Sequence, residues 1–269
     1  ISGLTSTEVT SLNLGQLQQL TSTQIGGLST SGLAGLSAFN ITNIFTTTQE
    51  AGLTSTQILS LTATQEIALT TEQISSLTTT QESGLTTDQI ALLTTVQESA
   101  LTSTQIVSLT STQASGLTST QIASFKTTQF NALTTNLIAG LTTTSLAGLR
   151  STQVASLTTT QEAGLATDQI AALSTTQEAG LSTTQISALT SAQASGLTPT
   201  QILSMTTTQI SALTSTQIIG LTTTVILDLA SAQINSLTVQ QLEALTPSQI
   251  IILTSSQLSL LSTTQESFL

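Results

Sequence analysis

Leu101-Thr102-Ser103-Thr104-Gln105-Ile106-Val107-Ser108 is one copy of an eight-residue unit that recurs through most of the chain. From Phe45 to Leu269 the first position of this octad falls every eight residues and is Leu at 26 of 29 occurrences. A unit this short cannot enclose a hydrophobic core, so its copies must stack on one another as a solenoid. Gln fills the fifth position at 25 of 28 occurrences, the exceptions being Leu137, Ser145 and Val225.

Each octad contains the signals that start and stop a helix. Thr102 and Gln105 have the spacing of a capping box, in which the hydroxyl and the glutamine side chain each accept the other residue's backbone amide. Pro199 follows a capping threonine at the first helical position, where proline is favoured. Gly at the eighth position, as in Gly84, favours a left-handed closing residue. We therefore predict an all-α solenoid of very short capped helices, one per octad.

A β-solenoid is the alternative fold, because Thr, Ile and Val favour strands. The reliably apolar positions are the first and the sixth, so their spacings of five and three residues fit the alternation of a strand poorly.

The sixth position has a second period, of sixteen residues. Apolar residues such as Ile58 and Ile74 alternate there with acids such as Glu50 and Glu66. This alternation predicts about two helices per coil in a 16-residue unit, with one helix turned inward and the other partly exposed. The acids would then form a solubilising stripe. From 202 to 258 the sixth position is apolar in every octad, including those where an acid is expected. This predicts a thicker core or a face buried against a second chain or a flanking segment.

The sequence predicts a single elongated repeat body with two parts. Residues 1–44 are less regular octads, because the step from Leu36 to Phe45 spans nine residues and shifts the register near 40–44. We expect a bulge or kink there. Residues 45–269 form the regular octad solenoid, and the whole is read as a slice of a longer array.

Composition excludes several classes of partner. Thirteen acids face two bases, Lys126 and Arg150, so nothing could neutralise the phosphates of a nucleic acid. No apolar run approaches the length of a membrane span, so we expect no membrane insertion.

The chain also lacks the residues of common catalytic and metal sites. It contains no His and no Cys, so neither an activated nucleophile nor a zinc site can be assembled in the usual way. The acids are isolated rather than clustered as calcium ligands. Lys126, which replaces a capping Thr, is expected to be an ordinary surface lysine. We predict that the protein is not an enzyme and has no catalytic, cofactor or metal site.

The tandem Leu-Thr-Thr-Thr-Gln-Ile/Glu pattern resembles the low-complexity octad-repeat arrays of very large bacterial surface or secreted proteins. The resemblance implies an extracellular or cell-surface stalk, adhesin or filament component. The preferred hypothesis is a structural protein whose partners are copies of itself, as a homo-oligomer or filament. The alternative is a module that binds ice or carbohydrate through its regular Thr rows.

Overall fold

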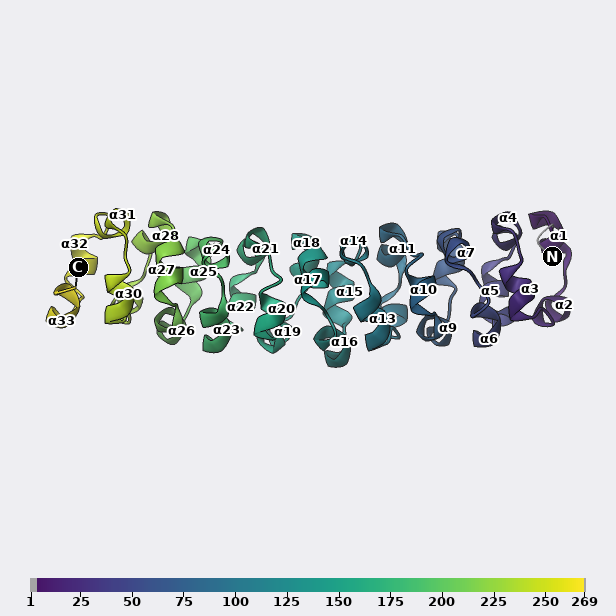
Figure 1. Cartoon of the computed structure of the whole chain (residues 1–269), viewed down its shortest axis with the longest axis horizontal. Helices are drawn as coiled ribbons and strands as arrows, with labels where there is room; N and C mark the ends of the chain where they lie inside the picture. Colours follow the sequence, from purple (N-terminus) through teal and green to yellow (C-terminus); the bar gives the residue numbers. More distant parts are fainter. Residues whose placement is uncertain (1–3, 269) are drawn as a thin grey trace. The chain divides into compact units, whose positions relative to one another are not determined.

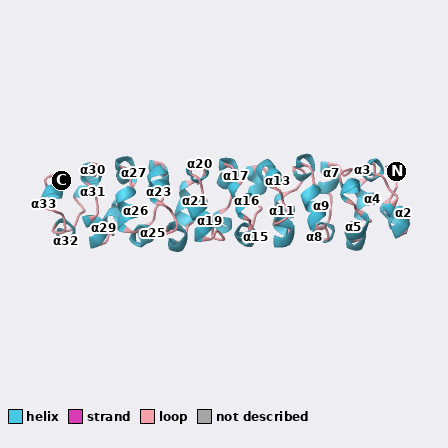
Figure 2. Ribbon diagram, turned by 90° about the horizontal axis from the view of Figure 1, so that it is seen from below, coloured by secondary structure: helices cyan, strands magenta, loops and turns pink. Residues whose placement is uncertain are grey.

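The computed structural model describes residues 4–268, and in that range the chain is built from 33 short helices without a strand (Figures 1 and 2). This confirms the predicted all-α solenoid of short helices. The helices follow one another at the spacing of the octad.

The chain forms two compact units, Ile1–Leu141 and Thr142–Leu269. The helices of the first unit are α1 (Ser6–Ser11), α2 (Leu14–Gln18), α3 (Ser22–Gly26), α4 (Thr30–Ala34), α5 (Ala38–Ile44), α6 (Thr47–Glu50), α7 (Ser55–Leu59), α8 (Ala63–Ile67), α9 (Thr71–Ser76), α10 (Thr79–Glu82), α11 (Thr87–Leu92), α12 (Thr95–Glu98), α13 (Ser103–Ser108), α14 (Ser111–Ala114), α15 (Ser119–Ser124), α16 (Thr127–Asn131) and α17 (Thr135–Gly140). The helices of the second unit are α18 (Thr143–Leu146), α19 (Ser151–Ser156), α20 (Thr159–Glu162), α21 (Thr167–Ala172), α22 (Thr175–Glu178), α23 (Thr183–Ala188), α24 (Ser191–Ser195), α25 (Pro199–Ser204), α26 (Thr207–Ala212), α27 (Ser215–Gly220), α28 (Thr223–Leu227), α29 (Ser231–Asn235), α30 (Val239–Glu243), α31 (Pro247–Ile250), α32 (Ser255–Leu258) and α33 (Thr263–Glu266).

The capping residue sets the start of each helix. Thr102 has an extended backbone (φ −77°, ψ 159°), and its hydroxyl accepts the amide of Gln105 at 3.2 Å. Helix α13 ends at Ser108, and the backbone of the following Leu109 has ψ 141° and leads into the next cap. Isolated helices this short are unstable in water. Packing between successive coils must therefore stabilise them.

A coil contains more than the two helices expected from the 16-residue period. Helix α10 packs against α7 and α13, and its Gln81 bonds to the end of α6, so a coil closes after three to four helices. The same spacing of three helices recurs in the second unit, where α21 packs against α18 and α24. In most octads of this wider coil the first- and sixth-position side chains both point inward; Leu258 and Glu266, near the end of the second unit, are exposed.

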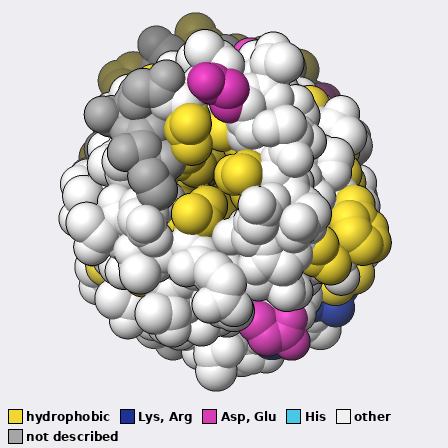
Figure 3. All heavy atoms as spheres, turned by 90° about the vertical axis from the view of Figure 1, so that its right-hand side faces the viewer, with side chains coloured by type: hydrophobic (Ala, Val, Ile, Leu, Met, Phe, Trp, Pro, Cys, Tyr) yellow, Lys and Arg dark blue, Asp and Glu magenta, His cyan; other side chains and the backbone are white. Residues whose placement is uncertain are grey.

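The core of each unit consists of these two rows of side chains. Leu101 is 4% exposed and Ile106 is fully buried, and equivalent residues repeat along both units. Figure 3 looks onto the face where the N-terminal helices lie. It shows hydrophobic side chains gathered at the centre, with mostly uncharged polar atoms around them.

The glycines at the eighth position do not adopt the left-handed conformation that we expected. Among the described residues no glycine has a positive φ. Their role is close contact between coils: a Cβ on Gly84 would lie 2.5 Å from the carbonyl oxygen of Ser55, and one on Gly196 equally close to that of Thr167. The missing side chain therefore allows the backbone of one coil to touch the backbone of the preceding coil.

The extra residue between Leu36 and Phe45 lengthens a helix. Helix α5 has seven residues, whereas the other described helices have four to six. The added residue is thus absorbed as helix where a bulge or kink was expected.

Candidate functional site

The fifth-position glutamine is the most repeated polar element of the fold. In α13, Gln105 Oε1 accepts the backbone amide of Thr102 at 2.8 Å and completes the predicted capping box. Its Nε2 donates to the carbonyls of Ile74 at 2.7 Å and Leu77 at 3.1 Å, one coil earlier. Both carbonyls lie at the end of helix α9. The Ile74 carbonyl also accepts the Leu77 amide at 3.4 Å, whereas the Leu77 carbonyl lies past the last residue of the helix, where intrahelical donors are absent. One buried amide therefore starts a helix and closes the end of another.

This glutamine bridge recurs along both units. The sequence predicted the capping half of it from the Thr–Gln spacing, but the carbonyl partners depend on the size of the coil. Bridges to carbonyls 28 to 32 residues earlier are made by Gln49, Gln57, Gln65, Gln73, Gln81, Gln89, Gln97, Gln105, Gln113, Gln121 and Gln129, and by Gln177, Gln185, Gln193, Gln201, Gln209, Gln217, Gln233, Gln241, Gln249, Gln257 and Gln265.

A few octads lack one part of this device. Four N-cap residues do not accept the amide three residues later through a side chain, although the following Gln still accepts their own backbone amide: Lys126, Arg150, Ala166 and Ala230. The Lys126 side chain is exposed, as expected, and its Nζ donates to the carbonyl of Ser99 at 2.7 Å.

The acidic residues at the sixth position are buried, which corrects the expected solubilising stripe. Six glutamates are at most 1% exposed, and they occupy the inward position that Ile fills in the intervening octads. The alternation of Ile with Glu therefore does not mark an inner and an outer helix. These buried residues are Glu50, Glu66, Glu82, Glu98, Glu162 and Glu178.

Several of these carboxyl groups have few or no hydrogen-bond partners. Both side-chain oxygens of Glu162 and of Glu178 lack one. Neither oxygen of Glu66 makes a hydrogen bond, and burial outweighs the opposing effect of the nearby Gln89 amide on its pKa. Desolvation dominates and raises the pKa of both Glu66 and Glu162 to about 8. These groups are therefore largely protonated at neutral pH.

Most sixth-position residues of the apolar stretch from 202 to 258 lie in the core of the second unit, whereas Leu258 at its end is 36% exposed. Ile210, Ile226 and Leu242, which stand where acids occur elsewhere, are at most 1% exposed. The first of the two expected explanations, additional core, accounts for these residues.

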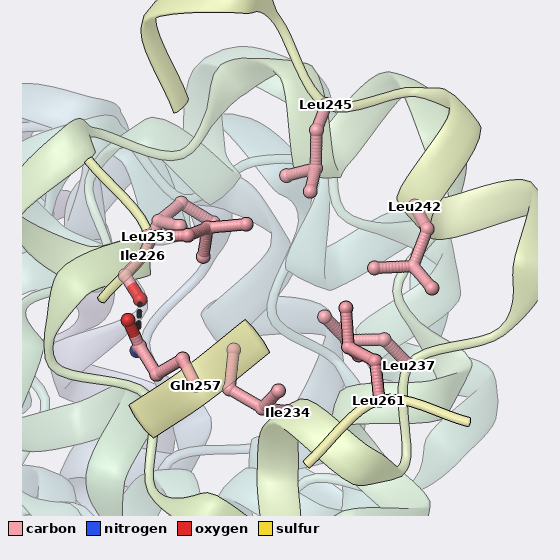
Figure 4. Close-up of a pocket in the computed structure, with 8 residues that line it drawn as sticks. All are labelled: Ile226, Ile234, Leu237, Leu242, Leu245, Leu253, Gln257 and Leu261. Atoms are coloured by element: carbon pink, nitrogen blue, oxygen red, sulfur yellow. Dashed lines mark hydrogen bonds between the residues drawn. The ribbon is translucent and has the colours of Figure 1, made fainter. Parts of the chain in front are cut away.

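The interior near the end of the second unit leaves no room for an organic ligand. Figure 4 shows apolar side chains from several octads converging with Gln257, which bonds to the Ile226 carbonyl at 3.3 Å. The cavity between them is about 10 Å³, which is at the threshold for a single water.

A larger hollow lies on the surface of the first unit. It measures about 420 Å³ and is shared by α13, α14 and α17. Hydroxyl and amide side chains dominate its wall, and Val107 adds an apolar surface. The other lining residues are Leu109, Thr110, Ser111, Thr134, Asn136 and Ala139.

Within residues 4–268, no three His, Cys, Asp or Glu side chains are grouped so as to hold a metal ion. No helix in this range is long and apolar enough to cross a membrane.

One comparison with known proteins gives a match. Residues 163–199 match a family model described as the ALTTAQ repeat. The chain is a repeat protein. The segment Ala188-Leu189-Thr190-Ser191-Ala192-Gln193 reproduces that hexapeptide with one Ser for Thr, and it spans the capping Thr and the bridging Gln. The ALTTAQ description therefore covers the residues that start each helix and join it to the preceding coil. No curated protein matches the chain.

Proposed function

We propose that this chain is a structural repeat protein of the bacterial cell surface or extracellular space, acting as a self-associating filament subunit or adhesin stalk. The observation that carries the proposal is the glutamine bridge. The chain repeats this buried hydrogen-bonded link between coils, as an element that resists mechanical tension would require. Location outside the cell rests on the resemblance to surface arrays.

The bridge suits a mechanical role because it distributes the resistance to opening over every coil. Each intramolecular hydrogen bond contributes about 1 kcal/mol, and an unsatisfied buried partner costs about 1–3 kcal/mol. In the second unit, for example, the single side chain of Gln217 donates to two carbonyls, those of Ile186 and Leu189. Separating one coil from the next breaks three or four of these pairs of hydrogen bonds together with the apolar contacts between the coils.

Self-association is supported by an exposed apolar row on the second unit. Leu203 on α25, Leu227 on α28 and Ile251 directly after α31 each stand five residues after the N-cap, and these helices pack in that order. They are 49%, 45% and 84% exposed. At this position most octads carry Ser or Ala. A second copy could cover this row at little electrostatic cost, because only 6% of the residues are charged.

Electron microscopy and light scattering of the purified chain test this function. We expect concentration-dependent fibres or oligomers, which should weaken in the double variant Leu227→Ser/Ile251→Ser. The matched control, Val107→Ser/Ile219→Ser, removes exposed apolar residues outside the row and should assemble as the parent does. A chain that stays monomeric at millimolar concentration contradicts the proposal.

Glycan binding is a second candidate function, favoured by the hollow on α13, α14 and α17. Its hydroxyls and the Asn136 amide can hydrogen-bond to sugar hydroxyls, and Val107 offers an apolar contact. A glycan array would test it: binding that is lost on Asn136→Leu supports this candidate, and no binding to any glycan rejects it. The ice-binding form of this candidate is weaker, because the first Thr of most octads is already engaged in capping.

A further inference from the structure

We propose that the buried glutamates make the solenoid a proton-dependent fold, whose coils hold together while these side chains are neutral and open as they ionise. The inference concerns folding and is independent of the structural role proposed above. It rests on where the side chains lie, on what surrounds them and on the hydrogen bonds they make.

The first argument is position. Glu82 and Glu98 are at most 1% exposed and point into the same core as Ile74 and Ile90. One oxygen of each has no hydrogen-bond partner, and Glu178 lacks partners on both. A carboxylate in such surroundings is strongly disfavoured, whereas the neutral acid is tolerated.

The second argument is the serine that contacts three of these glutamates. Ser76 Oγ lies 3.0 Å from Glu50 Oε2 and 3.0 Å from the carbonyl of Gln73. One hydroxyl has a single proton and cannot donate fully to both. If the carboxyl is protonated, it donates to Ser76 Oγ while the serine donates to the carbonyl, so each proton has an acceptor. The same arrangement recurs at Ser108 with Glu82 and, more loosely, at Ser124 with Glu98.

The third argument is the absence of a compensating positive charge among the helices packed on these glutamates. Lys126 precedes α16, whose Gln129 bonds to the backbone of Glu98, but the lysine is exposed and donates to Ser99. Arg150 precedes α19, which packs on the α22 helix of Glu178, and it too is exposed.

The remaining charged groups on those helices are acids. Glu72 on α9 faces the helices of Glu50 and Glu98, and Asp88 on α11 faces that of Glu66; both are exposed. The buried glutamates of adjacent coils are also neighbours of one another. Gln81 on α10 bonds to the Glu50 carbonyl, which makes Glu82 a neighbour of Glu50, and Gln97 on α12 bonds to the Glu66 carbonyl, which makes Glu98 a neighbour of Glu66. Ionisation of one would oppose ionisation of the next.

The direction of the pH effect follows from burial. Desolvation raises the pKa of Glu50, Glu98 and Glu178 to about 8 and that of Glu82 to about 7, from 4.5. The folded chain thus binds protons that the unfolded chain has released, and stability falls as the pH rises from about 4.5 through 8. For each such group the folding equilibrium constant drops about tenfold per pH unit inside this window. Neutralising six of thirteen acids also changes the formal charge from −11 to −5.

Urea unfolding of the full chain between pH 5 and pH 9, followed by circular dichroism, tests the proposal. The midpoint should decrease steadily with pH in the parent chain. It should vary much less in the variant Glu50→Gln/Glu66→Gln/Glu82→Gln/Glu98→Gln, which keeps the side-chain shape without the charge. The matched control Glu72→Gln/Asp88→Asn, on the exposed face, should retain the dependence of the parent. A parent midpoint that is independent of pH overturns the proposal, as does an unchanged slope in the buried variant.

A second measurement covers the case in which the buried variant does not fold. Carbon-13 NMR of the unaltered chain, labelled at the Glu side-chain carboxyl, reports each titration directly. We expect a group of glutamates that titrate between about pH 7 and 8, well above Glu8 and Glu72, whose pKa is lowered by hydrogen bonds to backbone amides. Titration of every glutamate below pH 5.5 would overturn the proposal.

Discussion

The side-chain amide of Gln105 donates to the carbonyl of Ile74, 31 residues earlier, at 2.7 Å. The same side chain accepts the amide of Thr102 through its oxygen. Local helix initiation and long-range stacking therefore depend on one residue, and this coupling explains why Gln is nearly constant in a sequence whose neighbouring positions exchange Ser, Thr and Ala.

Replacing a bridging glutamine should cost far more than replacing one that only closes a cap. In Gln105→Leu, the amide of Thr102 and the carbonyl of Leu77 lose their partner, and the Ile74 carbonyl keeps only the Leu77 amide, so we expect a loss of about 2–3 kcal/mol in the free energy of unfolding. Gln16→Leu is the control, because Gln16 is exposed and accepts from Asn13 at 2.9 Å without a bridge to another coil; about 0.5–1 kcal/mol is expected. Equal losses in the two variants, measured by urea unfolding, would contradict a bridging role.

Restoring the bridge should stabilise an octad that lacks it. Val225 is buried at the fifth position of α28, and the carbonyls 31 and 28 residues earlier belong to Ala194 and Leu197. Val225→Gln should raise the free energy of unfolding by about 1 kcal/mol. Val225→Leu adds volume without the amide and should give no gain. A Gln variant less stable than the Leu variant would refute this.

The N-caps without a hydroxyl offer an independent test. Ala230→Thr should add a side-chain acceptor for the Gln233 amide, which now donates to the Ala230 carbonyl at 2.9 Å, and stabilise the chain by about 1 kcal/mol; Ala166→Thr should likewise add a side-chain cap to α21. Ala232→Thr, placed inside α29, serves as the control and should be neutral or slightly destabilising. Thermal unfolding distinguishes these outcomes, and a gain at Ala232 equal to that at Ala230 would argue against capping.

Replacing one buried glutamate with isoleucine, which fills the sixth position of the intervening octads, should stabilise the folded chain at pH 8. Glu162→Ile removes two unpartnered oxygens, and at pH 8 we expect a gain of about 1–3 kcal/mol that shrinks at pH 5. Asp168→Asn, on the exposed face of α21, should change little at either pH. A gain from Glu162→Ile that is the same at pH 5 and pH 8 would show that ionisation is not the cause.

The positions where helices start were predictable from the sequence, whereas the number of residues in a coil was not. The Thr102–Gln105 spacing and Pro199 determine where helices start, because both depend on backbone groups within three residues. The partners of Gln105 lie 28 and 31 residues away, and no short-range signal encodes that distance.

The prediction that the sixth-position acids are exposed is wrong for a related reason. Glu50 and Glu66 alternate with Ile58 and Ile74, and charge ordinarily indicates exposure. Their exchange with Ile at a fixed inward position was the available signal, since a position that is apolar in every second octad belongs to the core in all of them. The close contact at Gly84 likewise depends on the preceding coil, which a single octad cannot reveal.

The most direct measurement of the coil size is disulfide formation in this cysteine-free chain. A Cβ on Gly220 would lie 3.6 Å from the Cβ of Ser191, 29 residues earlier, within the range that a disulfide spans, and 2.8 Å from the Ser191 carbonyl oxygen, so the two coils must shift slightly to admit it. The pair Gly220→Cys/Ser191→Cys should therefore oxidise to an intramolecular crosslink. The pair Gly220→Cys/Ser204→Cys, separated by the 16 residues of a two-helix coil, should not. A crosslink in the second pair and none in the first would contradict the coil size and the glutamine bridges that depend on it.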